Sequence, residues 1–177
     1  EKENAPKFVY AHPYRPGHSQ DSGQCLPDEK ELYETRLQDA NSWMKDDVST
    51  ILEKDPNAIV IIAGDHGPFL TKNCYHTSDD YDISEITRLD IQDRYGTFLA
   101  IRWPTQEFEK YDDHIIVLQD IFPVVFAYIF ENEDFLEAKI DPITLRTFSI
   151  SEAKVVDGKI VGGKNHGEPL FLSGDVP

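Results

Sequence analysis

The order of apolar and polar residues along this chain predicts several of its elements. Residues 7–11 are rich in aromatic and β-branched side chains, which predicts a strand. Between Tyr33 and Ile51, apolar residues recur at spacings of three and four, which predicts a helix with one face on a core. Asp28 and Glu31 form a capping-box pattern at the start of this helix, and Asp55-Pro56-Asn57 ends it.

A continuous apolar run at residues 58–63 follows the helix at once and is typical of a buried parallel strand. The order of strand, loop, helix and strand indicates a βαβ unit, in which the crossover is right-handed and the strands are parallel. Residues 95–103 predict a further strand. Residues 72–93, in contrast, are polar and acidic, and we expect an exposed excursion there.

The last third of the chain predicts one helix and one hairpin. The helix begins near Asp120, with Pro123 in its first turn, where proline is tolerated. Asp157-Gly158 is a signal for a type I′ turn between two short strands. The whole pattern predicts a single α/β domain over residues 1–177, in which a mostly parallel sheet is flanked by helices and followed by a small β-hairpin tail.

Composition limits the classes of function. The 177 residues include 33 acidic and 17 basic side chains, for a formal net charge of −16, and this charge repels nucleic acid. Hydrophobic residues make up 40% of the chain, which indicates a globular protein. No apolar run approaches the roughly 18 residues of a membrane span. Residues 1–6 do not resemble a signal peptide, and we interpret them as a cut or a linker.

Asp65 and His66 are the strongest candidates for chemistry. They stand side by side where the apolar run ends, at the carboxyl end of a predicted strand, which is where ligand sites of open α/β sheets gather. A carboxylate and an imidazole are good ligands for a divalent metal ion. The alternative is a helix-capping aspartate beside a packed histidine.

The loop of residues 12–18 is the second candidate and carries His12, Arg15 and His18. The planar fork of Arg15 suits a tetrahedral anion, and either histidine could bind a metal ion or contact a substrate. The alternative is a surface loop whose histidines are incidental. Ser19 is a weaker candidate for a nucleophile.

The remaining histidines and the cysteines give weaker signals. His76, His114 and His166 are more typical of solvated side chains. Cys25 and Cys74 could form one disulfide, as in an exported protein, or remain two independent thiols.

These motifs resemble the later part of a sulfatase-like domain of the alkaline phosphatase superfamily. The resemblance is greatest to membrane-anchored enzymes of the phosphoglycerol and phosphoethanolamine transferase and lipoteichoic acid synthase type. It covers residues 7–130 and leaves the tail of residues 147–177 without an assigned role. It rests on the His-Pro-Tyr loop at residues 8–14, a long helix with Tyr33, Leu37 and Asn41, the Asp-His-Gly-Pro sequence at residues 65–68, and residues 93–98.

The resemblance implies a metal-dependent hydrolase or transferase that acts on phosphate or sulfate esters. Asp65 and His66 would hold a divalent ion (Mn, Zn, Ca or Mg), and His12 would contact the anionic substrate or a second metal ion. Arg15 and His18 have no firm counterpart in the family and are predicted to bind substrate from the loop itself. The resemblance also implies a membrane-anchored parent protein, exported to the periplasmic or extracellular face of the membrane.

One part of the family pattern is absent. The nucleophile and an early acidic metal ligand of the family precede the His-Pro-Tyr loop, and only a few residues of this chain do so. We therefore expect the carboxyl-terminal half of such a domain, with weak metal binding and little turnover alone. The alternative is a non-catalytic binding or assembly module that retains the fold.

Overall fold

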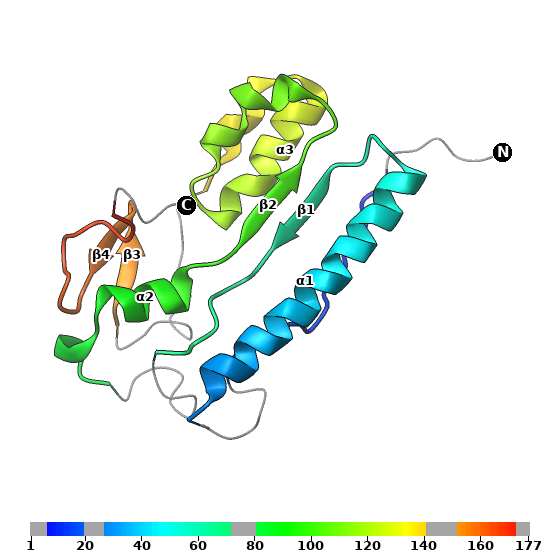
Figure 1. Cartoon of the computed structure of the whole chain (residues 1–177). Coiled ribbons are helices and arrows are strands. Elements are labelled where there is room, and N and C mark those ends of the chain that lie inside the picture. The colour runs from blue at the N-terminus through cyan, green and yellow to red at the C-terminus, as the bar shows by residue number, and fades with distance from the viewer. Residues whose placement is uncertain (1–6, 20–26, 72–80, 141–151, 173–177) are drawn as a thin grey trace.

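The computed structural model describes residues 7–19, 27–71, 81–140 and 152–172 (Figure 1). Within these ranges the helices are α1 (Glu29–Lys54), α2 (Arg88–Tyr95) and α3 (Ile121–Phe130), and the strands are β1 (Val60–Ala63), β2 (Leu99–Arg102), β3 (Lys154–Val156) and β4 (Lys159–Val161). Short 3-10 helices are found at Ile83–Glu85, Gln106–Lys110, Asp112–His114, Leu118–Asp120 and Glu133–Ala138.

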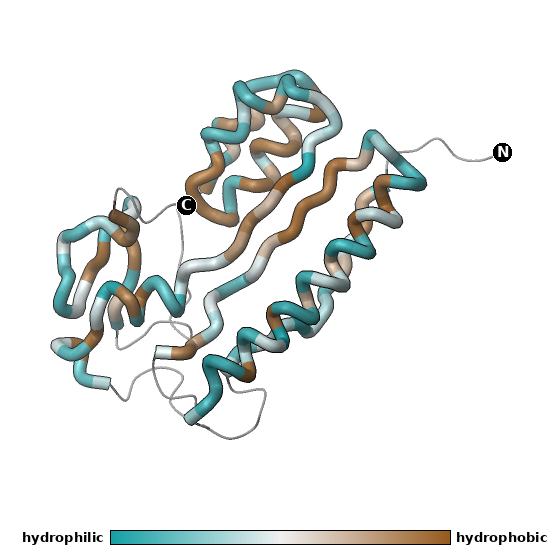
Figure 2. Tube along the Cα trace, viewed as in Figure 1, coloured by the Kyte–Doolittle hydropathy of each residue, from teal (hydrophilic) through white to brown (hydrophobic). Residues whose placement is uncertain are grey.

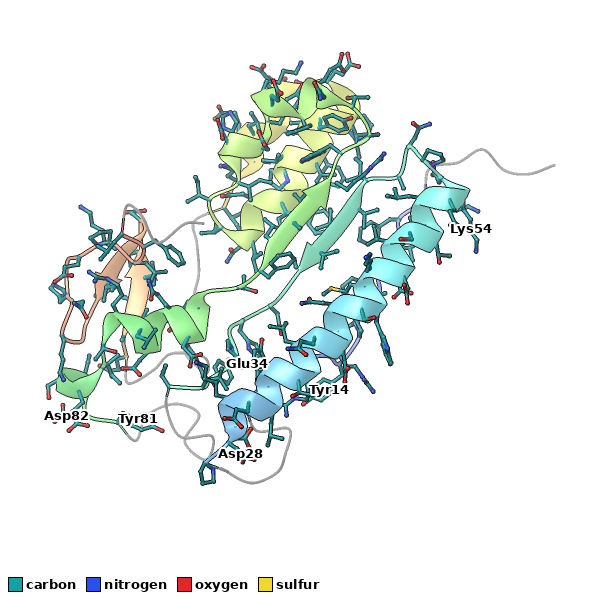
Figure 3. All side chains as sticks on the ribbon, in the orientation of Figure 1. Tyr14, Asp28, Glu34, Lys54, Tyr81 and Asp82 are labelled. Atoms are coloured by element: carbon teal, nitrogen blue, oxygen red, sulfur yellow. The ribbon has the colours of Figure 1, made fainter. Side chains whose placement is uncertain are left out.

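The long helix α1 confirms the prediction from the apolar spacing. Ala40 is buried, and Leu37 and Met44 on the same face are half-buried. Asp28 is the N-cap, but its side chain makes no capping hydrogen bond, so the expected capping box does not form. Figure 3 marks the two ends of the helix by Asp28 and Lys54.

The predicted mostly parallel, alkaline phosphatase-like sheet is wrong. In the described part of the chain there are two sheets, each of two antiparallel strands. β1 pairs with β2, from Val60 opposite Arg102 to Ala63 opposite Leu99. The apolar run of β1 has no alternation, so its sequence did not reveal its partner or its direction.

The first predicted strand is also wrong. Residues 7–11 are exposed and form no strand, and no backbone hydrogen bond joins them to another described segment. Without that strand there is no βαβ unit. β2 is also shorter than predicted, because α2 continues to Tyr95 and ends at Gly96.

One core joins α2 to the tail. Ile86 and Ile91 come from the region of α2, and Ala153, Ile160 and Leu170 come from the tail. All five are buried. The predicted exposed excursion is therefore wrong for Ile86, Asp90 and Ile91, which are buried, whereas residues 82–85 are exposed as predicted. Residues 72–80 lie outside the described ranges. A hairpin does form in the tail, because β3 and β4 pair around Asp157 and Gly158, which both have positive φ.

A second core lies beneath α3, which begins and ends as the sequence predicts. Tyr111, Val124 and Ala127 are buried there. Figure 2 shows hydrophobic residues along β1, β2 and α3, and some of them remain exposed on α3, including Phe122, Phe126, Ile129 and Phe130. Across the view of Figure 1, α1, β1, β2 and α3 follow one another, with α2 and the hairpin beyond the ends of the strands.

Among the described residues, no helix is both long enough and apolar enough to cross a membrane.

Candidate functional site

The segment of residues 64–71 leaves the end of β1 and carries the predicted metal ligands. Its backbone lies against the end of α2, where the Gly67 N–H donates to the carbonyl oxygen of Arg94 at 3.1 Å. A Cβ atom at Gly67 would collide with the backbone of Asp93. Glycine at this position is therefore required by a close approach of two backbone segments.

Asp65 and His66 are brought together as the sequence predicts. His66 Nε2 lies 3.6 Å from an Asp65 carboxylate oxygen, and the two side chains are 27% and 79% exposed. His66 Nδ1 lies 2.8 Å from the Gly67 carbonyl oxygen. A carbonyl oxygen only accepts, so Nδ1 donates a hydrogen bond to Gly67 O, and Nε2 is the nitrogen nearer Asp65.

This geometry fits two ligands of one metal ion. Ligands about 2.1 Å from a tetrahedral ion stand roughly 3.4 Å apart, close to the separation of Asp65 and His66. A backbone carbonyl that holds Nδ1–H is also the usual outer partner of a metal-binding histidine. Within residues 7–19, 27–71, 81–140 and 152–172, however, no group of three or more His, Cys, Asp or Glu side chains could hold a metal ion. The described chain thus offers two ligands.

Ser19 connects the His-Pro-Tyr loop to the segment after β1. Its N–H donates to Pro68 O at 3.0 Å, and its hydroxyl donates to Phe69 O at 2.8 Å. The residue is only 2% exposed. These contacts give Ser19 a structural role, and they do not support it as a nucleophile. They also bring the His18 ring to 5.9 Å from the His66 ring.

His12 and Arg15 lie apart from this contact. His12 is exposed, and its ring lies 6.2 Å from that of Tyr10. The guanidinium carbon of Arg15 lies 4.1 Å from the centre of the Trp43 ring on α1. Of the three predicted substrate-binding residues, the structure thus brings His18 alone to the Asp65–His66 pair through a described contact.

Phe69 and Arg94 are site residues that the sequence did not reveal. The Phe69 ring stacks on His66 at 4.6 Å between centroids, and the Arg94 guanidinium lies 3.8 Å from the Phe69 ring centre. Phe69 has a φ of 60°, which is unusual for a bulky residue and is frequent at functional sites. Arg94 is buried, and this burial lowers the pKa of its guanidinium. Residues 93–98 were part of the resemblance, but as the start of a strand.

Asp93 fixes the far end of the same segment. One of its carboxylate oxygens accepts hydrogen bonds from the Thr71 N–H at 3.0 Å and from the Thr71 hydroxyl at 3.2 Å. Burial raises the pKa of Asp93, and the bonds from Thr71 and the backbone of Leu70 oppose that rise. The end of α2 therefore holds the segment at both Gly67 and Thr71.

The other candidates do not reach this site through any described contact. His114 lies in an exposed 3-10 helix, and His166 accepts a hydrogen bond from the Gly162 N–H at 3.0 Å within the tail. His76, Cys25 and Cys74 lie outside the described residues.

Comparisons of the chain with protein-family models, curated proteins and solved structures gave no match.

Proposed function

We propose that this chain carries part of the metal site of a sulfatase-like hydrolase or transferase of phosphate or sulfate esters. Asp65 and His66 are two of the metal ligands in this proposal. The observation that carries it is the 3.6 Å separation of His66 Nε2 and the Asp65 carboxylate, with Nδ1 turned to a backbone carbonyl. The sequence resemblance adds the reaction class.

The bound ion would act as a Lewis acid on an oxygen of the ester group. Asp65 supplies negative charge to the ion, and His66 supplies the neutral imidazole that such an ion prefers. His18 is the nearest candidate for contact with the substrate, because its ring lies beside that of His66.

The proposal does not depend on the fold that the resemblance implied. That fold is a mostly parallel sheet, and the structure contradicts it. Two local features support the proposal. Asp65 and His66 follow directly after the end of β1, and the His-Pro-Tyr loop brings His18 beside His66.

The first experiment is a calorimetric titration of the chain with Mn²⁺ and with Zn²⁺. We expect weak binding, because two protein ligands leave much of the coordination shell to water. The double variant Asp65→Ala/His66→Ala should weaken binding by about tenfold or more, since both ligands are lost.

The chain offers a matched control in a second Asp-His pair, Asp113 and His114, on an exposed 3-10 helix. The variant Asp113→Ala/His114→Ala makes the same change in composition and should leave metal affinity unchanged. Equal affinities of the wild type and the Asp65→Ala/His66→Ala variant would contradict the proposal.

A binding or assembly module is the second candidate function, and the exposed aromatic rings of α3 favour it. Phe122, Phe126 and Phe130 follow one another along that helix, with centroids 6.1 and 6.4 Å apart, and each is at least 42% exposed. Exposed apolar groups of this kind often mark contact with another protein. The absence of metal binding in the titration would favour this second candidate.

A further inference from the structure

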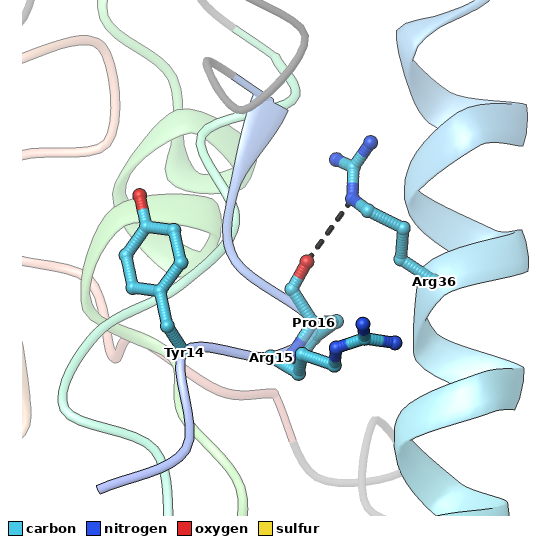
Figure 4. A pocket seen from close by; sticks show the side chains of 4 residues that line it. All are labelled: Tyr14, Arg15, Pro16 and Arg36. Atoms are coloured by element: carbon cyan, nitrogen blue, oxygen red, sulfur yellow. Dashed lines mark hydrogen bonds between the residues drawn. The ribbon is translucent and has the colours of Figure 1, made fainter.

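A pocket of about 330 Å³ lies between the His-Pro-Tyr loop and α1. It is lined by Tyr14, Arg15, Pro16 and Arg36 (Figure 4). The same loop contacts the segment after β1 through His18 and Ser19, as described above. The residues that line the pocket do not include Asp65, His66 or His18.

Arg36 reaches the pocket from α1 and is fixed in place by backbone oxygens. Its Nε donates to Pro16 O at 3.0 Å, and its Nη2 donates to His18 O at 3.0 Å. The figure shows the first of these bonds as a dashed line between helix and loop. Both partners are neutral, so they orient the guanidinium without cancelling its charge.

Arg15 approaches from the loop, and its described partner is also neutral. Its guanidinium carbon lies 4.1 Å from the centre of the Trp43 ring. The face of an aromatic ring attracts a cation but leaves its net charge intact. Figure 4 shows the Arg15 side chain pointing toward α1, on the side from which Arg36 comes.

Neither arginine forms an ion pair in the described part of the chain, where the ion pairs of other side chains include Lys30–Glu34, Arg88–Glu168 and Lys139–Asp120. Acidic residues outnumber basic ones by 33 to 17 in this protein. Two guanidinium groups whose described partners are neutral therefore meet at one pocket of a strongly acidic protein. Their mutual repulsion would be relieved by a bound anion.

We propose that this pocket binds the phosphate or sulfate group of an organic ester through Arg15 and Arg36. A tetrahedral oxyanion matches the planar fork of Arg15, which can donate two parallel hydrogen bonds. Arg36 gives its Nε and one Nη2 hydrogen bond to the loop and adds positive charge and its remaining N–H donors. The volume of the pocket lies at the lower end of the range for small organic ligands, about 300 Å³ and above. The pocket therefore has room for the group that carries the oxyanion. This inference does not depend on the metal site.

The test is a calorimetric titration of the full chain with phenyl phosphate, inorganic phosphate and phenol, in the presence of a metal chelator. We expect phenyl phosphate to bind more tightly than inorganic phosphate, and phenol not to bind. Arg15→Gln should weaken phenyl phosphate binding by about tenfold or more, because a charge-assisted hydrogen bond is lost. Arg15→Lys keeps the charge but loses the planar fork, so its affinity for phenyl phosphate should lie between those of the wild type and Arg15→Gln.

Lys54→Gln is the matched control, since it removes one positive charge at the far end of the helix that carries Arg36 (Figure 3). It should leave binding unchanged. The proposal is overturned if the wild type does not bind phenyl phosphate, if Arg15→Gln binds it as well as wild type, or if Lys54→Gln loses as much affinity. Equal affinity for inorganic phosphate would overturn the assignment to an ester.

The two proposals can fail separately. Asp65→Ala/His66→Ala should lose metal binding and keep phenyl phosphate binding. Arg15→Gln should lose phenyl phosphate binding and keep metal binding. Loss of phenyl phosphate binding in Asp65→Ala/His66→Ala, with the chelator present, would overturn the assignment to the arginine pocket.

Discussion

At the scale of single residues, the site depends on contacts to the backbone. His66 is oriented by the carbonyl of Gly67, Ser19 by that of Phe69, and Arg36 by those of Pro16 and His18. A backbone carbonyl fixes an imidazole or a guanidinium without adding charge. These carbonyl partners orient the His66 ring through Nδ1 and the Arg36 guanidinium through Nε and Nη2, and they bring no opposite charge to either group.

Asp93 gives a prediction about pH at this scale. Burial raises its pKa above the ordinary value of 3.8, so the folded protein holds this proton to a higher pH than the unfolded chain does. The ionised carboxylate then costs stability, and the free energy of unfolding falls as the pH rises from 3.8 through the folded pKa. Asp93→Asn lacks this loss and can still accept a hydrogen bond from Thr71.

We expect the stability of Asp93→Asn relative to wild type to increase between acidic and neutral pH. Urea unfolding of both proteins at a series of pH values measures the difference. Asp113→Asn, at an exposed position, should show no such trend. Parallel stability curves for wild type and Asp93→Asn would contradict the prediction.

At the scale of elements, the tail is part of the fold. β3 and β4 pack on α2, and Ile160 joins Ile86 and Ile91 in a core from which water is excluded. Asn165 also accepts a hydrogen bond from the Arg88 N–H at the start of α2, at 2.8 Å. The hairpin thus covers the helix whose other end holds the Asp65–His66 segment.

Ile160→Ala should destabilise the protein by about 2 to 4 kcal/mol, because it leaves a cavity in a fully buried position. Val156→Ala in the same hairpin is the control, since Val156 is 44% exposed and should cost less than about 1 kcal/mol. The free energy of unfolding in urea measures both. Equal small losses would mean that the hairpin does not pack on α2.

At the scale of the whole molecule, the net charge of −16 dominates. Most of this charge is on exposed side chains, where like charges repel and salt screens them. Ion pairs within the chain, such as Lys30–Glu34, leave this excess unchanged, because the net charge already counts both partners. The negative field of the whole protein attracts a metal cation to the Asp65–His66 pair. The same field repels an anion, so anion binding at the pocket needs the positive charges of Arg15 and Arg36.

Stability at pH 7 should therefore increase with salt, by about 1 kcal/mol between roughly 0.02 M and 0.3 M sodium chloride. Unfolding in urea, which is uncharged, measures this change. The effect should vanish near pH 4.6, the isoelectric point expected from the sequence, where the net charge is small. A decrease of stability with salt at pH 7 would show that attractive pairs outweigh the repulsion.

The sequence by itself determined the elements whose signals are local. The 3.6-residue period of α1, the start of α3 at Asp120 and the turn at Asp157-Gly158 all depend on neighbours within a few residues, and the structure contains each of them. The sequence also predicted that Asp65 and His66 lie together after a strand, because the two residues are neighbours in the chain.

Tertiary structure decided what depends on distant partners. The apolar run of β1 fits a parallel or an antiparallel neighbour equally well, and only the return of the chain after α2 fixes the antiparallel pairing with β2. The same is true of Arg15 and His18, three residues apart in one loop. Packing against α1 draws Arg15 to Trp43 and Arg36 to the loop, while Ser19 draws His18 toward His66. No local pattern encodes which side of a loop each neighbour will cover, and that choice separates the two proposed sites.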